Sequence, residues 1–313
     1  MLNDINPLKP SYIYKIWGGE KLSKKKLEST NVSANNNPLG ETWEVSIHPE
    51  GPSFLMNGEN LSNYYSENEL PYLIKFIDTN DFLSVQVHPN DEYAKRVENS
   101  IGKTECWIIT DADPGAGIYL GFENGVDATT FKKAVDDKED LTPYLKFHEV
   151  KKGDLFVVPA GSIHAIGKGI TLIEIQQSSG ITYRVWDWNR VEKDGRPRAL
   201  HIEKAMDILD FAGDHNTDEY FKIRKNLNFC EGSNEVLSHR DFNVSLVNLD
   251  QGFNKHQLTG KRAVSVVCLE GNINISSKNQ VQKLNAFESA IIKLDVNELE
   301  ISTEGRCSYV FVT

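Results

Sequence analysis

Four side chains with the chemistry of metal ligands occur in three short segments of the chain: Gln86 and His88, Glu105, and His164. Alternate residues of a β-strand point to the same face, so Gln86 and His88 are expected on one face of a strand. Glu105 begins an otherwise apolar segment, and a carboxylate that leaves water needs a partner that offsets its desolvation. Two imidazoles and a carboxylate suit a catalytic zinc ion. These residues therefore predict a divalent metal site.

His164 follows a segment whose turn residues indicate where one strand ends and the next begins. Residues 153–164 read Gly-Asp-Leu-Phe-Val-Val-Pro-Ala-Gly-Ser-Ile-His. Residues 155–158 have the composition of a buried strand, and Pro159 with Gly161 should turn the chain so that His164 opens the following strand. A histidine after a turn is more often a hydrogen-bonded structural residue than a ligand. Only the combination with the other two segments favours a metal.

These segments resemble the cupins, which are small β-barrels that hold a metal. Residues 153–164 match the second cupin motif, which is a glycine, an apolar run, Pro-x-Gly, two residues and a histidine. The first motif departs from the usual His-x-His, because Gln86-x-His88 stands there and Glu105 follows at a long distance. That departure, together with the run at 181–190, resembles the type I mannose-6-phosphate isomerase family, and the short bacterial form is the nearest match.

The resemblance extends over most of the chain and implies roles for particular residues. It implies one zinc ion per chain, held at the positions that match Gln86, His88, Glu105 and His164. It implies a catalytic role for Arg184 and Lys103, and a substrate pocket that contains Trp17, Ser84, Lys103 and Arg184. The implied reaction interconverts D-mannose 6-phosphate and D-fructose 6-phosphate through an enediol-like intermediate. The sequence does not identify the residue that moves the proton.

Several of these residues also have a simpler interpretation. Gln86 can hold a neighbouring ligand in place instead of binding the metal directly. Glu105 can form a partly buried ion pair with Lys103 or Arg184. Trp17, beside two glycines, can stack on a sugar or close one end of a barrel. The sequence leaves these alternatives open.

Two other functions fit the same residue pattern. His88, Glu105 and His164 also form a two-histidine, one-carboxylate set of the kind found in non-haem iron oxygenases. Alternatively, the barrel binds a sugar phosphate without converting it. Gln86 beside the metal and the two nearby cations favour the isomerase over the oxygenase, and the intact ligand set argues against a purely binding role.

Composition narrows the range of partners. The chain has 313 residues, of which 39% are hydrophobic and 25% charged, as in an ordinary soluble globular protein. A net charge of −11 without a basic cluster argues against nucleic acid, so the expected partner is a small sugar phosphate in a locally basic pocket. The four cysteines form no Cys-x-x-Cys pair, and no stretch approaches the length of a membrane span. We expect a cytoplasmic protein that does not bind membranes.

Short apolar segments separated by turn residues predict a mainly β protein. We expect a cupin, or jelly-roll-like β-barrel, catalytic domain with short helical insertions over residues 1–232. A second, smaller and degenerate β-barrel is expected over residues 233–313, with strands at 264–270 and within 286–294. This second part has no Pro-x-Gly-x-x-His segment, so no metal is expected there.

Helices are expected at three places in the first domain. Asn90 can cap a helix over residues 91–97, with two acids favourably placed in its first turn. Asp127 precedes apolar residues at helical spacing, and residues 201–211 show the same periodicity.

Overall fold

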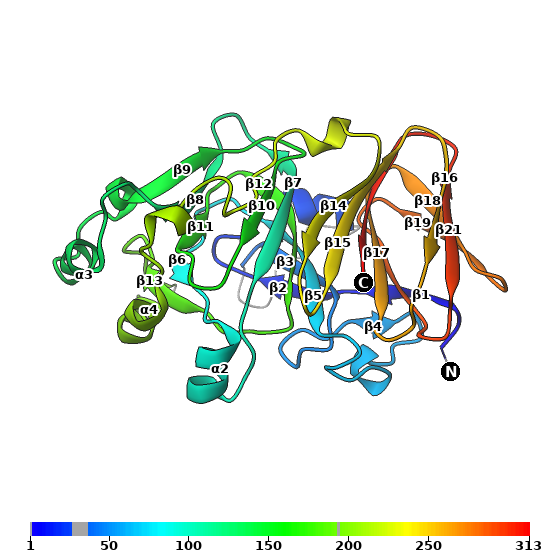
Figure 1. The fold of residues 1–313 in the computed structure, drawn as a ribbon, viewed down its shortest axis with the longest axis horizontal. Helices are drawn as coiled ribbons and strands as arrows, with labels where there is room; N and C mark the ends of the chain where they lie inside the picture. Colours follow the sequence, from blue (N-terminus) through cyan, green and yellow to red (C-terminus); the bar gives the residue numbers. More distant parts are fainter. Residues whose placement is uncertain (1, 27–36, 193–194) are drawn as a thin grey trace.

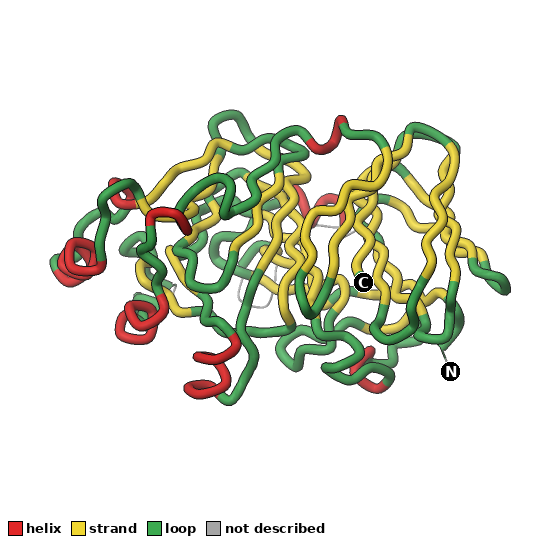
Figure 2. The backbone as a smooth tube through the Cα atoms, in the orientation of Figure 1, coloured by secondary structure: helices red, strands yellow, loops and turns green. Residues whose placement is uncertain are grey.

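A computed structural model describes residues 2–26, 37–192 and 195–313 of the chain, and β-strands dominate these residues (Figures 1 and 2). Within them the strands form four antiparallel sheets, and the helices are short and lie outside the sheets. The expectation of a mainly β protein with a few helical insertions is confirmed.

Two of the sheets carry the predicted site residues. The six-stranded sheet has the order β10-β7-β12-β5-β3-β2, with bounds Leu155–Val158, Glu105–Ala112, Ile170–Gln177, Tyr72–Asp78, Leu39–Val45 and Ser11–Tyr14. The five-stranded sheet has the order β13-β6-β11-β8-β9, with bounds Tyr183–Trp186, Val85–Val87, His164–Ile166, Gly117–Phe122 and Leu145–Glu149. The strand predicted at 155–158 and the strand expected to start at His164 are both confirmed.

The other two sheets are built mainly from the C-terminal part of the chain. The seven-stranded sheet has the order β14-β15-β22-β17-β20-β1-β4, with bounds Gly232–Ser238, Asn243–Leu249, Cys307–Val312, Val264–Glu270, Ser289–Ile292, Ile5–Lys9 and Phe54–Leu55. The four-stranded sheet has the order β16-β21-β18-β19, with bounds Gly252–Gln257, Glu298–Thr303, Asn272–Ser276 and Val281–Asn285.

The N-terminal strand belongs to this C-terminal sheet. β1, dark blue in Figure 1, pairs with β20 so that Ile5 lies opposite Ile292. Ile5 is fully buried in the core between the seven- and four-stranded sheets. The chain therefore starts in one half of the molecule and crosses into the other, and the division at residues 232 and 233 stays a prediction.

The six-stranded sheet has one apolar face and one partly charged face. Cys106 and Ile108 of β7 point into a core shared with the seven-stranded sheet, where they meet residues such as Leu246 and Val310. The alternate residues, including Trp107, belong to a different core on the opposite face. This is the period of two expected for a strand that is buried on both sides.

The helices follow the sequence signals at their N-termini. α2 (Asp91–Glu98) is capped by Asn90, whose side chain accepts a hydrogen bond from the backbone N–H of Tyr93. α3 (Ala128–Asp136) is capped in the same way by Asp127. α4 (Ile202–Ile208) is shorter than the expected 201–211 because the backbone is already extended at its C-cap. The remaining helix, α1 (Lys21–Lys26), was not expected.

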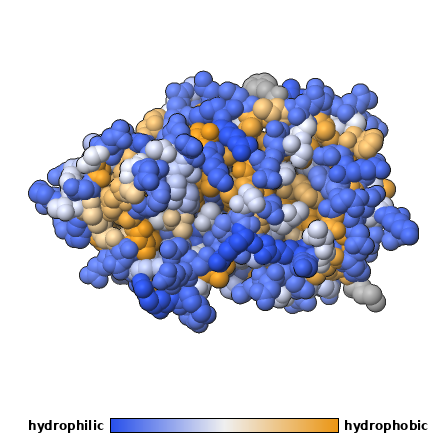
Figure 3. Space-filling view, in the orientation of Figure 1, coloured by the Kyte–Doolittle hydropathy of each residue, from blue (hydrophilic) through white to orange (hydrophobic). Residues whose placement is uncertain are grey.

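The face of the molecule in Figure 3 is covered mostly by hydrophilic residues, with apolar residues in scattered patches. Among the helices of the described residues, none has both the length and the apolar character needed to cross a membrane.

One half-buried histidine in the C-terminal part is expected to make the fold sensitive to acid. His256 of β16 stacks on Phe311 at a ring distance of 3.8 Å, and burial lowers its pKa to about 4. Its pKa in an unfolded chain is about 6.5. As pH falls below that value, His256 takes up a proton in the unfolded chain but not in the folded one. The free energy of unfolding therefore falls by up to about 1.4 kcal/mol per pH unit until the folded pKa is reached.

We expect His256→Phe, which keeps the stacked ring and cannot titrate, to remove this contribution. Urea unfolding of the wild type and the variant at pH 7, 6 and 5 measures it. The stability of the variant relative to the wild type should rise as pH falls, and parallel pH dependences would contradict the expectation.

Candidate metal site and adjoining cavity

Strand register places three of the predicted residues in a row. Gln86 of β6 pairs with His164 of β11 on one side and with Arg184 of β13 on the other. Directly opposed residues of neighbouring antiparallel strands point to the same face of a sheet. His88 follows the end of β6, two residues beyond Gln86, and shares that face.

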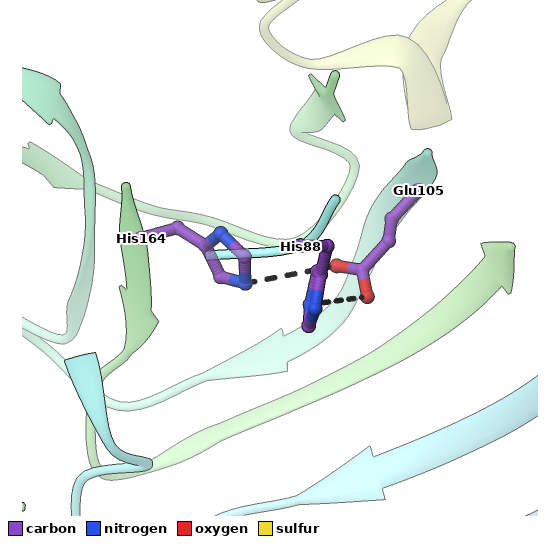
Figure 4. Close-up of side chains that lie close together, drawn as sticks. All are labelled: His88, Glu105 and His164. Carbon is purple, nitrogen blue, oxygen red and sulfur yellow. Dashed lines mark ion pairs between the residues drawn. The ribbon is translucent and has the colours of Figure 1, made fainter. Parts of the chain in front are cut away.

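The carboxylate comes from the opposite sheet. Glu105 is the first residue of β7, and its side chain points toward both imidazoles (Figure 4). The His88 Nε2 atom lies 3.1 Å from Glu105 Oε1, and the His164 Nε2 atom lies 3.9 Å from Glu105 Oε2. One ligand atom from each of these three buried residues lies within 4.8 Å of the other two. The spacing is small enough for one metal ion to contact all three.

Backbone contacts orient both imidazoles toward the same point. The Nδ1 atom of His88 lies 2.8 Å from the carbonyl oxygen of Ile181, and that of His164 lies 3.0 Å from the carbonyl oxygen of Ser162. A carbonyl oxygen only accepts hydrogen bonds, so each Nδ1 must carry the proton. Each Nε2 then presents its lone pair, which is the tautomer that a metal ligand requires.

The protonation states also suit a cation. Burial and the nearby Lys103 lower the pKa of His88 to about 3, and burial lowers the pKa of His164 as well. Burial works to raise the pKa of Glu105, but the nearby Lys103 outweighs it and holds that pKa well below its usual range. At neutral pH the site therefore offers two neutral imidazoles and one ionised carboxylate, the forms that bind metals.

Lys103 partly compensates the buried carboxylate. It is 5% exposed, and its Nζ atom lies 2.6 Å from Glu105 Oε1 and 3.3 Å from His88 Nε2. Within the described residues, however, both Glu105 oxygens lack a hydrogen bond of good geometry. The contact with Lys103 is thus an ion pair by distance, and the oxygens keep lone pairs for a further cation. The Glu105–Lys103 ion pair, which the sequence left open as an alternative, is therefore present together with the metal-ligand arrangement.

Gln86 contacts the ligand set through its amide nitrogen, and its amide oxygen points elsewhere. Its Nε2 atom lies 3.2 Å from His164 Nε2, while its Oε1 atom accepts a hydrogen bond from Ser84. The amide oxygen, which is the atom that binds metals, therefore points toward Ser84. Exchange of the amide oxygen and nitrogen would reverse this orientation. Direct coordination by Gln86 stays a prediction.

A cavity of about 130 Å³ adjoins the ligand set. Its lining includes Trp17, Ser84, Lys103 and Arg184, the four residues predicted for a substrate pocket. It also includes three cations that the sequence reasoning missed, Lys15, Lys75 and Arg198. A small cavity with five basic side chains favours an anionic ligand. A larger hollow of about 420 Å³ lies between the six- and seven-stranded sheets, but none of the predicted site residues lines it.

Two carboxylates in this cavity were also missed. Glu174 of β12 contacts Lys75 at 2.8 Å and accepts a hydrogen bond from the Trp107 indole, and Glu41 of β3 lies 3.6 Å from Lys75. Burial and the nearby Glu105 raise the pKa of Glu174. Burial acts in the same direction on Glu41, but Lys75 outweighs it and the pKa is lowered. A glutamate within the apolar run of β12 was the available sequence signal for Glu174.

Trp17 precedes two glycines that pack closely against neighbouring segments. A Cβ atom on Gly18 would lie 2.8 Å from the backbone of residues 38–40, and one on Gly19 would lie 2.4 Å from the Asp78 carboxylate. These glycines are thus required for close packing. Trp17 is buried and packs with Leu83, and it also lines the cavity, so the two interpretations of its role are compatible.

Together these features define a mainly β protein with a buried metal-ligand set beside a cation-lined cavity. Residues 5–105 match the family model for the catalytic domain of type I phosphomannose isomerases. The chain is 36% identical over 226 residues to the mannose-6-phosphate isomerase ManA of Bacillus subtilis, a match that covers 64% of this chain and 67% of the relative. The chain belongs to the type I phosphomannose isomerase family.

A second relative and a solved structure agree with this assignment. The chain is 42% identical over 210 residues to the mannose-6-phosphate isomerase of Streptococcus mutans serotype c. This match covers 62% of this chain and 64% of that relative. The crystal structure of the mannose 6-phosphate isomerase from Bacillus subtilis superposes with a TM-score of 0.81 and 25% identity, over 99% of this chain and all of that one.

The geometry ranks the four predicted ligands. We expect His88→Ala, Glu105→Ala and His164→Ala each to abolish tight metal binding, because each removes one of three convergent donors. Gln86→Ala should retain part of the bound metal, since the Gln86 amide oxygen faces Ser84. Elemental analysis of the purified variants, with circular dichroism as a control for folding, tests this ranking. Full metal content in any of the first three would contradict the site.

Proposed function

We propose that this chain is a zinc-dependent aldose–ketose isomerase that interconverts D-mannose 6-phosphate and D-fructose 6-phosphate. The observation that carries the proposal is the meeting of a metal-ligand set and a cation-lined cavity at one place in the fold. A sugar phosphate needs both, a Lewis acid for its carbonyl end and basic side chains for its anionic end. Membership of the phosphomannose isomerase family supports the same substrate.

The donor set supports one zinc ion per chain. Two neutral imidazole nitrogens and a carboxylate are a common ligand set of catalytic zinc, with a further position left for water or substrate. The buried oxygens of Glu105, which lack a hydrogen bond of good geometry within the described residues, fit a cation at that point. When bound there, a divalent metal would supply Lewis-acid polarisation of the substrate carbonyl and stabilisation of the negative charge that develops on its oxygen.

The cavity residues supply binding and charge compensation. Lys103 lies beside the ligand set, so its ammonium is placed to stabilise an enediolate oxygen, in keeping with a catalytic role. Arg184, in register with Gln86 on the adjoining strand, is placed to hold a second anionic oxygen. Ser84 and Trp17 complete the lining, one offering a hydroxyl and the other an apolar surface.

Glu174 is the group we assign to move the proton between C1 and C2. It lines the cavity, and its raised pKa makes it a stronger base than an ordinary glutamate. Its hydrogen bond from Trp107 and its ion pair with Lys75 fix the direction of the carboxylate. Glu41 lines the same cavity but its lowered pKa makes it a weaker base.

We expect Glu174→Gln to lower kcat by about 10² to 10⁴, because a positioned general base typically contributes that much. The metal content should stay at the wild-type level, since Glu174 lies outside the ligand set. A coupled assay of mannose 6-phosphate isomerisation, with zinc measured on the same sample, checks both. A wild-type kcat would assign the proton transfer to another group.

Removal and return of the metal tests the whole proposal. Chelation should abolish isomerisation of mannose 6-phosphate, and zinc should restore it. Isomerase activity in a preparation shown to be metal-free would contradict a metal-dependent mechanism. Oxygen consumption that depends on added iron would instead support an oxygenase, and sugar phosphate binding without turnover would support a binding protein.

A further inference from the structure

We propose that Arg198 holds the phosphate group of the substrate and that Asp187 is the residue that positions it. This inference deepens the proposed function, because it rests on a sugar phosphate as the ligand. Neither residue stood out in the sequence, since both lie in a loop after β13. The structure brings Arg198 to the wall of the cavity, on the side formed by Arg184 and Thr182.

Asp187 accepts hydrogen bonds from two arginines. It is 5% exposed, and its two oxygens accept hydrogen bonds from the Arg198 Nε atom at 2.8 Å and from Arg198 Nη2. It also accepts a hydrogen bond from Arg190 at 2.7 Å. Burial works to raise the pKa of Asp187, but the hydrogen bonds from the two arginines outweigh it and lower the pKa. A two-point contact of this kind fixes the plane of the guanidinium.

The fixed orientation leaves part of Arg198 for a ligand. Asp187 engages Nε and Nη2, so Nη1 is the terminal nitrogen that it does not engage. The next residue is fixed as well, because the carbonyl oxygen of Ala199 accepts a hydrogen bond from Arg184 Nη1 at 2.7 Å. The two arginines are therefore linked through the backbone and share one wall of the cavity.

Three arginines share two close carboxylates on this wall. Asp187 pairs with Arg190 and Arg198, and Asp81 pairs with Arg190 at 3.0 Å, while Arg184 has no ion pair within the described residues. Arg184, Arg190 and Arg198 gather around Asp187, and burial together with the nearby Arg198 lowers the pKa of Arg184. The Nε atom of Arg184 is buried and has no hydrogen-bond partner within the described residues. A phosphate dianion has the charge and the acceptor oxygens that this wall lacks.

Arg184, on this wall, and the metal ligand His164 lie on different strands of the five-stranded sheet. Gln86 lies between Arg184 and His164 in register, so Arg184 and His164 are two strand spacings, or about 10 Å, apart. A sugar 6-phosphate is an extended molecule whose reacting carbons and phosphate lie at opposite ends. With the reacting carbons at the metal, the phosphate reaches the wall that carries Arg198.

The test compares Arg198→Ala, Arg198→Lys and Asp187→Asn with the remote control Arg224→Ala, whose side chain bonds the backbone of Glu235. Zinc-loaded samples with matched metal content and thermal unfolding are assayed for mannose 6-phosphate kinetics. We expect KM to rise at least tenfold in Arg198→Ala, with kcat within about twofold, because a ground-state contact is lost. Arg198→Lys should lie between, since it keeps the charge and loses the fork.

The positioning role of Asp187 needs a readout that general damage would not give. Asp187→Asn should raise KM at least fivefold in the presence of Arg198 and should add nothing in the Arg198→Ala background, as a double-mutant cycle measures. An additive effect, or a fall in kcat at constant KM, would overturn this role. If Arg198→Ala does not fold, the KM values of Arg198→Lys and Asp187→Asn are compared with that of the wild type instead.

Binding of inorganic phosphate separates this proposal from the proposed function. Calorimetry on the zinc-loaded wild type and variants requires no turnover, and Arg198→Ala should weaken phosphate binding at least tenfold whichever reaction the protein catalyses. Unchanged phosphate binding and unchanged KM in folded Arg198→Ala would overturn the proposal even if the wild type is an isomerase. Phosphate binding that depends on Arg198 in a protein without isomerase activity would overturn only the reaction.

Discussion

The burial of Glu105 is the constraint on which the arrangement of this site depends. An ionised carboxylate that is 1% exposed is strongly destabilising unless cations or hydrogen-bond donors surround it. Lys103, on the segment before β7, supplies a cation at 2.6 Å. The neutral imidazoles of His88 and His164 on the facing sheet turn their Nε2 atoms toward the same carboxylate. These three groups converge as electron-pair donors, and a metal ion bound among them would complete the compensation of the carboxylate charge.

This requirement extends along the inner face of the six-stranded sheet. Glu174 and Lys75 are opposed across β12 and β5, and Trp107 lies opposite Glu174 on the other side. Glu174 and Lys75 are thus partners on neighbouring strands, and apolar residues around Trp107 pack on the same face. The opposite face of the sheet is apolar and packs on the seven-stranded sheet. An apolar layer therefore supports the layer that carries the candidate site residues, an arrangement that favours fixed distances between them.

The C-terminal part of the chain has a structural connection to the site through this apolar layer. β1 lies between β20 and β4 in the seven-stranded sheet, and the chain then continues into Trp17 and into Gly19, which packs closely on Asp78. The two halves of the molecule are thus linked by the N-terminal segment as well as by their shared core. This arrangement gives the second half a role in holding the six-stranded sheet, whichever way the chain is divided into domains.

The sequence by itself determined the mainly β class, the caps of α2 and α3, the strand over 155–158 and the segments that carry His88, Glu105 and His164. These follow from local rules, because alternation, capping residues and turn residues act over a few positions. It did not reveal Lys75, Glu174, Arg198 or Asp187, nor the pairing of β1 with β20. The places of Lys75, Glu174 and β1 depend on pairing between strands far apart in the sequence, and those of Arg198 and Asp187 depend on how the loop after β13 folds. Only the tertiary structure decided which of these charges became partners.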